Sequence, residues 1–243
     1  MISVCMAVFN GETYLEQQIL SLILQKNKID EVVIVDDAST DGSFEVINNL
    51  NLPNKKLFIN DINLGHVKTF EKTLSYAIGD IIFLSDQDDV WMEDKIATIK
   101  KIFDLNPTVN LVHHELLYVD SELHKLDRPL RLINFGLQNR FGFLLRQFYK
   151  PELFGCGIAI RKSLIEKLLP FPRNLYAHDH WLSIIAALHS DVYMSPLQLV
   201  KYRQHSNNLT PKKRNTFSKI LKLRILFAQM IVIALYRKIF KND

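Results

Sequence analysis

Short apolar runs alternate with segments of helical spacing through the first half of the chain. The apolar runs are residues 2–8, 31–35, 57–59 and 81–84, and each has the length of a buried strand. Between them, apolar residues recur at the three- and four-residue spacing that is typical of helices. A chain that alternates strands and helices in this way predicts an α/β fold with a mostly parallel, doubly wound sheet.

The pattern loosens after Trp91, but helix and strand signals continue to about residue 202. The expected helices are one that ends near residue 104 and three over residues 133–149, 164–169 and 176–188. The expected strands cover residues 111–119, 154–160, 192–194 and 199–202. No repeat or low-complexity stretch interrupts residues 1–206, so this part of the chain predicts a single domain.

The last part of the chain differs in charge from the rest. The formal net charge is +4, yet eleven of the 30 Lys and Arg residues follow residue 200, with only one of the 26 acidic residues. An apolar run over residues 225–236, broken only by Gln229, is shorter than the ~20 residues that a spanning helix needs. We expect residues 211–243 to form a basic amphipathic helical tail on an anionic membrane surface, and not on nucleic acid. The alternative is a helix that docks on the domain or in a homodimer contact.

Cysteine is scarce, since only Cys5 and Cys156 occur, both in apolar surroundings. This excludes a disulfide framework and favours a reducing compartment. The first residues, Met1-Ile2-Ser3, lack the positive region of a secretory signal, so a cytoplasmic location is expected.

Carboxylates gather at the ends of two predicted strands. Asp86, Asp88 and Asp89 directly follow the fourth apolar run, where bare charges could not face a dry interior. Asp86 and Asp88, two residues apart, suit one hard divalent cation and a phosphate bound to it. Asp36 and Asp37 follow the second run, and the carboxyl ends of parallel strands meet at one edge, so we expect a shared cleft. The alternative is that this pair only caps the next helix.

Other phosphate and metal motifs fail on inspection. A calcium EF-hand from Asp86 would need Gly and Glu where Trp91 and Ala97 stand. No glycine-rich phosphate loop follows the first strand. Residues 86–90 also match the opening motif of haloacid-dehalogenase-like phosphatases. Those enzymes place their second acidic pair after the nucleophile strand, whereas here it comes before, so this alternative is disfavoured.

Five segments together resemble family 2 glycosyltransferases of the GT-A fold. They are Asn10, VDDASTDGS at 35–43, SDQDDVW at 85–91, HDHW at 178–181 and YRQHSNN at 202–208. The SDQDDVW form is similar to bacterial rhamnosyltransferase-like enzymes of surface-polysaccharide (O-antigen or capsule) synthesis. The resemblance implies a GT-A domain over residues 1–210, with a nucleotide-binding half over 1–105 and an acceptor-side half over 106–210.

The resemblance also implies a donor site for a nucleoside-diphosphate sugar. Asp37 would contact the base or ribose, with Phe9 near the base and Asp86 by the ribose. Asp88 would hold Mn²⁺ or Mg²⁺ against the diphosphate. His205 would approach the metal or the diphosphate.

On the acceptor side, the resemblance makes Asp179 the general base, since a carboxylate must take the proton of the acceptor hydroxyl. Arg203, in contrast, belongs to the donor side and would lie near the bound donor. Further residues expected beside the acceptor are Trp91, Gly155, His180 and Trp181. The two tryptophans are also explained as packing residues beside the cleft.

The predicted activity is metal-dependent, inverting transfer of one sugar from a UDP- or dTDP-sugar to a hydroxyl of a lipid-linked or oligosaccharide acceptor. The Gln-x-x-Arg-Trp signature of processive synthases is absent, which favours one sugar per event. We expect a peripheral protein on the inner face of the plasma membrane. The alternative outside the enzymes is a sugar-nucleotide-binding protein without catalysis, which the joint presence of Asp37, Asp88, Asp179 and His205 disfavours.

Overall fold

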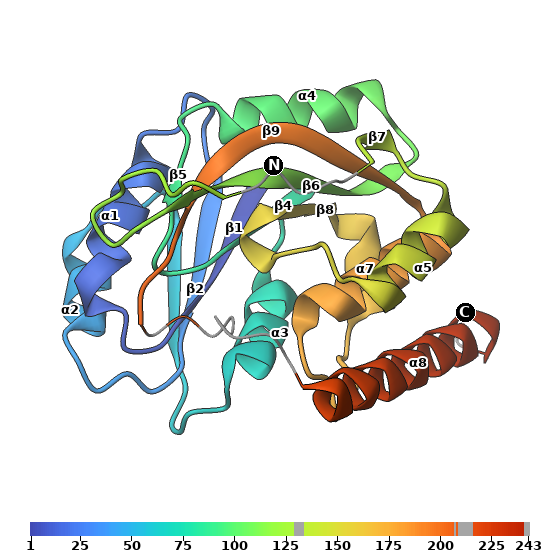
Figure 1. Cartoon of the computed structure of the whole chain (residues 1–243). Helices are drawn as coiled ribbons and strands as arrows, with labels where there is room; N and C mark the ends of the chain where they lie inside the picture. The colour runs from blue at the N-terminus through green and yellow to red at the C-terminus, as the bar shows by residue number, and fades with distance from the viewer. Residues whose placement is uncertain (129–133, 207, 209–215, 241–243) are drawn as a thin grey trace.

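A nine-stranded sheet runs through the computed structural model, which describes residues 1–128, 134–206, 208 and 216–240 (Figure 1). The strand order is β3-β2-β1-β4-β8-β6-β9-β5, with β7 paired to β9. The strands are β1 (Ile2–Val8), β2 (Glu31–Asp36), β3 (Lys55–Ile59), β4 (Ile81–Ser85), β5 (Val90–Trp91), β6 (Val109–Val119), β7 (Gly136–Leu137), β8 (Ile158–Arg161) and β9 (Asp191–Arg203).

Helices cover both faces of this sheet, which confirms the predicted α/β class. One face carries α1 (Glu12–Ile23), α2 (Ser43–Asn49) and α4 (Lys95–Leu105). The other carries α3 (His66–Tyr76), α5 (Arg140–Tyr149), α6 (Ile165–Leu168), α7 (His178–His189) and α8 (Phe217–Phe240). Along β1, Val4 and Met6 pack in the core on the side of α1, α2 and α4, and Cys5 packs in the core on the other side of the sheet. This alternation follows the two-residue period of a strand. The strand is therefore apolar on both sides.

The carboxyl ends of β1, β2 and β4 meet at one edge of the sheet. β2 and β4 run parallel to β1 on either side of it, with Val8 beside Asp36 and Met6 beside Ser85. The residues that follow these strands therefore emerge together. They are Phe9, Asp37 and Asp86.

The second half departs from the sequence prediction in three places. Residues 154–160 were predicted as one strand, but Gly155–Gly157 form a 3-10 turn, η1, and β8 begins after it. A second short turn, η2 (Lys162–Leu164), precedes α6. The two short strands predicted near the end are one long strand, β9, which bulges around Pro196 because proline has no N–H for the ladder. The helix predicted from residue 133 begins at Arg140, and residues 129–133 lie outside the described part.

The helix of the basic tail docks on the domain, as the alternative to a free tail predicted. α8 packs against α7 and α5 (Figure 1). Its Phe227, Met230 and Ala234 are buried in the same core cluster as Trp181. None of the helices described here is long and apolar enough to cross a membrane. Residues 211–215 and 241–243 of the predicted tail lie outside the described residues.

Candidate active site

A cavity of about 610 Å³ opens where β1 and β4 end. Its walls come from residues 7–14, from Asp37 and residues 63–70, from residues 86–88, and from the end of β9. Hollows of this size, at the carboxyl ends of α/β strands, are where such folds bind small ligands. Five of the predicted site residues line the cavity, namely Phe9, Asp37, Asp86, Asp88 and His205.

Asp37 is held in place by three donors from the neighbouring loop. Its carboxylate oxygens accept from the Asn60 side chain at 2.7 Å and from the backbone N–H groups of Leu64 and Gly65, both at 2.8 Å. Asp36 does not cap α2, which begins at Ser43 without a side-chain cap; its carboxylate accepts from the N–H of Ser39 in the turn before that helix. Asp36 therefore stabilises a turn, whereas Asp37 lines the cavity.

Gln87 ties together the two loops at the cavity entrance, a role that the sequence did not single out. Its side chain accepts from the Phe9 N–H at 2.7 Å and donates to the Phe9 carbonyl at 3.0 Å. The Phe9 side chain stays 44% exposed and lines the cavity, so its ring is free to contact a ligand.

Asp88 and His205 form a pair in the cavity wall. The His205 Nε2 lies 2.8 Å from Asp88 Oδ2, so the imidazole donates to the carboxylate. The Tyr14 ring lies 4.9 Å from the imidazole, between ring centroids, and limits its movement. A carboxylate and an imidazole that meet at a cavity wall offer ligands of the kinds that Mn²⁺ accepts.

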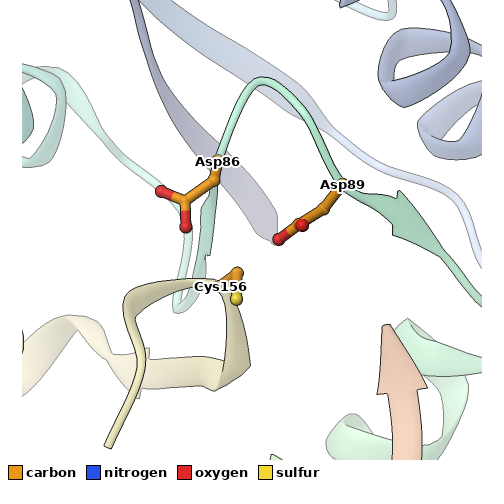
Figure 2. A group of neighbouring side chains, drawn as sticks. All are labelled: Asp86, Asp89 and Cys156. Carbon is orange, nitrogen blue, oxygen red and sulfur yellow. The ribbon is translucent and has the colours of Figure 1, made fainter. Parts of the chain in front are cut away.

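The carboxylate of Asp89 is fully buried, and Asp86, Asp89 and Cys156 each place one ligand atom within 4.8 Å of one another (Figure 2). Burial, with the nearby carboxylates of Asp88 and Asp179, raises the pKa of Asp86 to about 7. Burial also raises the pKa of the Cys156 thiol well above its usual range, so the sulfur stays protonated. Sulfur is a soft ligand that does not suit a hard cation such as Mg²⁺, which makes the Asp88–His205 pair the better candidate metal position.

Lys95 is a buried cation beneath this cluster that the sequence did not reveal. Its side chain is fully buried, and its Nζ donates to the Cys156 carbonyl at 2.8 Å and lies 3.7 Å from the Trp91 ring centroid. Burial lowers the pKa of Lys95 to about 7, and the nearby carboxylates of Asp89 and Asp86 oppose that change. One signal was available, because Lys95 falls on the buried four-residue spacing of Ile99 and Phe103.

Arg203 lies behind the cavity wall and not in it, which differs from the expected donor contact. It is 1% exposed, and its guanidinium donates to the Asp88 carbonyl, the Gln17 side chain and the Ser121 carbonyl. Its carbon Cζ also lies 4.4 Å from the Tyr14 ring centroid. All the contacts of Arg203 described here are with protein groups. Its role is therefore to position the turn that carries Asp88.

Asp179 lies half-buried in the first turn of α7 and is not among the residues that line the cavity. The charge of Asp179 is close enough to Asp86 to raise the pKa of that carboxyl. Burial lowers the pKa of His66, a cavity residue, while the carboxylates of Asp179 and Asp37 oppose that change. His66 thus lies between the donor-side and the predicted acceptor-side carboxylates. The sequence gave it no role.

The residues predicted beside the acceptor divide into core and surface positions. Trp91 and Trp181 are buried, and Trp181 Nε1 donates to the Leu168 carbonyl, so both act in packing. Gly155 is buried as well, and a Cβ there would meet His178 Nε2 at 2.6 Å. His180 is half-buried, with its ring 5.8 Å from that of Phe227, between centroids.

This geometry agrees with the match to known families. The sequence model described as glycosyl transferase family 2 matches residues 3–169. The chain belongs to this family. Membership sets aside the phosphatase alternative. The matched segment includes the turn of Asp88 and most of the cavity, but not its residues Tyr202, His205 and Asn208.

Two relatives illustrate the range of the family. An uncharacterised glycosyltransferase of Nostoc is 36% identical over 173 residues, which are 70% of this chain and 53% of the relative. The dTDP-rhamnosyl transferase RfbG of Shigella flexneri is 27% identical over 218 residues, which are 84% of this chain and 72% of the relative. The chain therefore spans about half the length of the Nostoc relative.

Two solved structures share the fold of this GT2 protein. TarS of S. aureus, in complex with UDP-GlcNAc, matches with a TM-score of 0.73 at 20% identity, over 97% of this chain and 72% of TarS. The mannosyltransferase PcManGT of Pyrobaculum calidifontis, in complex with GDP-Man and Mn²⁺, matches with a TM-score of 0.64 at 22% identity, over 100% of this chain and 64% of the other. These likenesses confirm the GT-A fold.

Proposed function

We propose that this GT2 protein transfers one sugar from a nucleoside-diphosphate sugar to an acceptor hydroxyl, with Mn²⁺ or Mg²⁺ as cofactor. The observation that carries the proposal is the meeting of Asp88 and His205 in the wall of the cavity that Asp37 and Phe9 also line. Asp179 does not line this cavity, but its charge acts on Asp86 and His66, which do. The cavity would thus supply the metal and nucleotide positions, with the base close to it.

The donor half of the proposed site rests on four residues. Asp88 and His205 would hold the metal, which when bound stabilises the negative charge that the nucleoside diphosphate gains as it leaves. Asp37, fixed by its three donors, would contact the base or ribose. The exposed Phe9 ring would lie against the base.

The acceptor half rests on Asp179. Asp179 lies in the first turn of α7, where its Oδ1 accepts from the backbone N–H of His180 at 2.8 Å. The carboxylate takes the proton of the acceptor hydroxyl as the oxygen attacks the anomeric carbon. The bond from that carbon to the diphosphate oxygen breaks on the opposite face. The product therefore has the inverted anomeric configuration.

We assign the donor to the UDP- or dTDP-sugars and the acceptor to lipid-linked or oligosaccharide hydroxyls of bacterial surface polysaccharides such as O-antigen or capsule. Support comes from TarS, which binds UDP-GlcNAc, and from RfbG, a dTDP-rhamnosyl transferase. Both cysteines are free and buried, which suits a reducing compartment. We place the protein on the cytoplasmic face of the plasma membrane as a peripheral enzyme.

A panel of UDP-, dTDP- and GDP-sugars tests the proposal by thermal shift, each with Mn²⁺ and with EDTA. We expect at least one donor to raise the melting temperature only when the metal is present. That donor is then incubated with the enzyme, with water as a slow acceptor, and released sugar is measured. No metal-dependent shift with any nucleotide sugar would refute the donor site. Binding without released or transferred sugar would favour the non-catalytic alternative.

A further inference from the structure

α8 is apolar on two opposite sides. One side buries Phe227, Met230 and Ala234 against the domain. The opposite side forms what we call the outer ridge, a line of apolar residues at the three- and four-residue spacing of one helix face. Its members are Leu221, Ile225, Ala228, Val232, Tyr236 and Ile239, and the five large side chains among them are 53–67% exposed.

A shallow groove adjoins this ridge. It has a volume of about 640 Å³ and lies between α8 and residues 172–174, with Ile225, Val232 and Ile233 among its lining residues. The loop supplies an exposed cation, Arg173, to the edge of the groove. Exposed apolar surface of this extent, rimmed by charged groups, is typical of an interaction site.

The charges of α8 all have one sign. The helix contains five Lys and Arg residues and no Asp or Glu. Three of these cations fasten the helix to the domain, since Arg224, Arg237 and Lys238 donate to the carbonyls of Tyr149, Pro170 and Leu188. Lys219 and Lys222 are exposed near the start of the helix. Two copies of such a helix face to face would bring like charges together, whereas an anionic lipid surface would offset them.

We propose that the outer ridge of α8, with the adjoining groove, is seated in the interfacial layer of an anionic membrane; this extends the peripheral location given under the proposed function. The apolar ridge enters the boundary between headgroups and acyl chains, and the flanking cations meet the anionic headgroups. The Phe227 ring contacts His180, the neighbour of Asp179. α8 therefore lies beside the start of α7, with its outer ridge on the side of the helix that faces away from His180.

Flotation of the full chain with lipid vesicles tests this surface. The double variant Ile225→Glu/Val232→Glu places two charges on the ridge, and the control Leu105→Glu changes an apolar residue, 71% exposed, at the end of α4 on the other face of the sheet. We expect wild type and control to bind vesicles of phosphatidylglycerol and phosphatidylethanolamine, and to bind phosphatidylcholine vesicles far less. The ridge variant should bind the anionic vesicles about tenfold more weakly or worse.

The substituted side chains point into solvent, so the ridge variant should keep the wild-type melting temperature; Val232→Ser serves as a milder second variant. Deleting α8 is a poorer test, because Arg237 covers the Trp181 ring at 5.1 Å and the core would be uncovered. Wild type that ignores anionic vesicles, or a ridge variant that binds like wild type, overturns the proposal. So does a wild-type dimer that the ridge variant turns into a monomer in analytical ultracentrifugation. Vesicle binding needs no donor, so its failure is distinct from a failure of sugar transfer.

Discussion

His205 Nε2 lies 2.8 Å from Asp88 Oδ2, although 117 residues separate the two along the chain. Asp88 stands in the turn between β4 and β5, and His205 follows the end of β9. β5 pairs with β9, with Val90 beside Lys201, so the register of the sheet brings the two side chains together. The proposed metal position therefore depends on strand pairing.

Asp88→Ala should abolish metal-dependent donor binding. The variant leaves His205 without its carboxylate partner and removes the oxygen ligand that a hard cation needs. We expect the affinity for the UDP- or dTDP-sugar in Mn²⁺ to fall by roughly a hundredfold or more, measured by isothermal titration calorimetry. Asp104→Ala, which removes an exposed carboxylate on α4, is the control and should bind like wild type. Wild-type affinity that EDTA leaves unchanged would contradict the metal assignment.

Asp179→Asn should separate binding from chemistry. Asparagine keeps the shape of the side chain but cannot accept the proton of the acceptor hydroxyl. We expect metal-dependent donor binding close to wild type, with sugar transfer slowed roughly a hundredfold or more, the scale of general-base catalysis. Transfer at nearly the wild-type rate would place the base elsewhere, with the buried Glu152 or His180 as the next residue to test.

Arg203→Lys should destabilise the fold and loosen the turn of Asp88. Lysine cannot reproduce the fork that reaches Gln17, Asp88 and Ser121, so buried acceptors lose their donors. We expect the free energy of unfolding to fall by about 2 kcal/mol or more, measured by urea denaturation. The control Arg140→Lys alters an exposed ion pair with Asp191 and should cost about 0.5 kcal/mol or less. Equal unfolding curves for the Arg203 variant and wild type would contradict this role.

His178 should make stability depend on pH. Burial lowers the pKa of His178 to about 4, against about 6.5 in an unfolded chain, so the unfolded chain binds more protons between these values. The contribution of His178 to the free energy of unfolding is therefore fully present above pH 6.5. It should fall by about 3 kcal/mol as the pH drops to 4. His178→Asn should flatten that part of the curve, measured as melting temperature against pH. His124→Asn, at an exposed histidine, should not, and parallel curves for wild type and His178→Asn would contradict the prediction.

The donor side of the site could be predicted from sequence because its determinants are local. The apolar runs of β1, β2 and β4 fix the strands, and the polar residues that follow must emerge at the edge where parallel strands end. Phe9, Asp37 and Asp88 line the cavity for this reason. The different contacts of Asp36 and Asp37 were harder to predict from the sequence. Those of Asp37 depend on residues 60–65, a loop that folds back over its carboxylate.

The buried cations were not predicted, because Lys and Arg are ordinarily exposed and this outweighed the spacing of Lys95 with Ile99 and Phe103. The burial of Arg203 depends on Gln17 and Ser121, which are distant in the sequence, and that of Lys95 on the Cys156 carbonyl. The same holds for the tail. Its charges predicted an anionic partner, yet three cations of α8 bond to backbone carbonyls that only the folded domain presents.

The contacts of Arg203 also set an order of events during protein synthesis. The guanidinium joins three segments that leave the ribosome earlier, around residues 17, 88 and 121. Until β9 has been made and has inserted between β6 and β5, the turn of Asp88 lacks both this anchor and His205. A nascent chain that already holds β1 to β4 and Asp37 would thus lack the Asp88–His205 pair that we propose as the metal position. The proposed site is complete only after β9 and the residues that follow it have been translated.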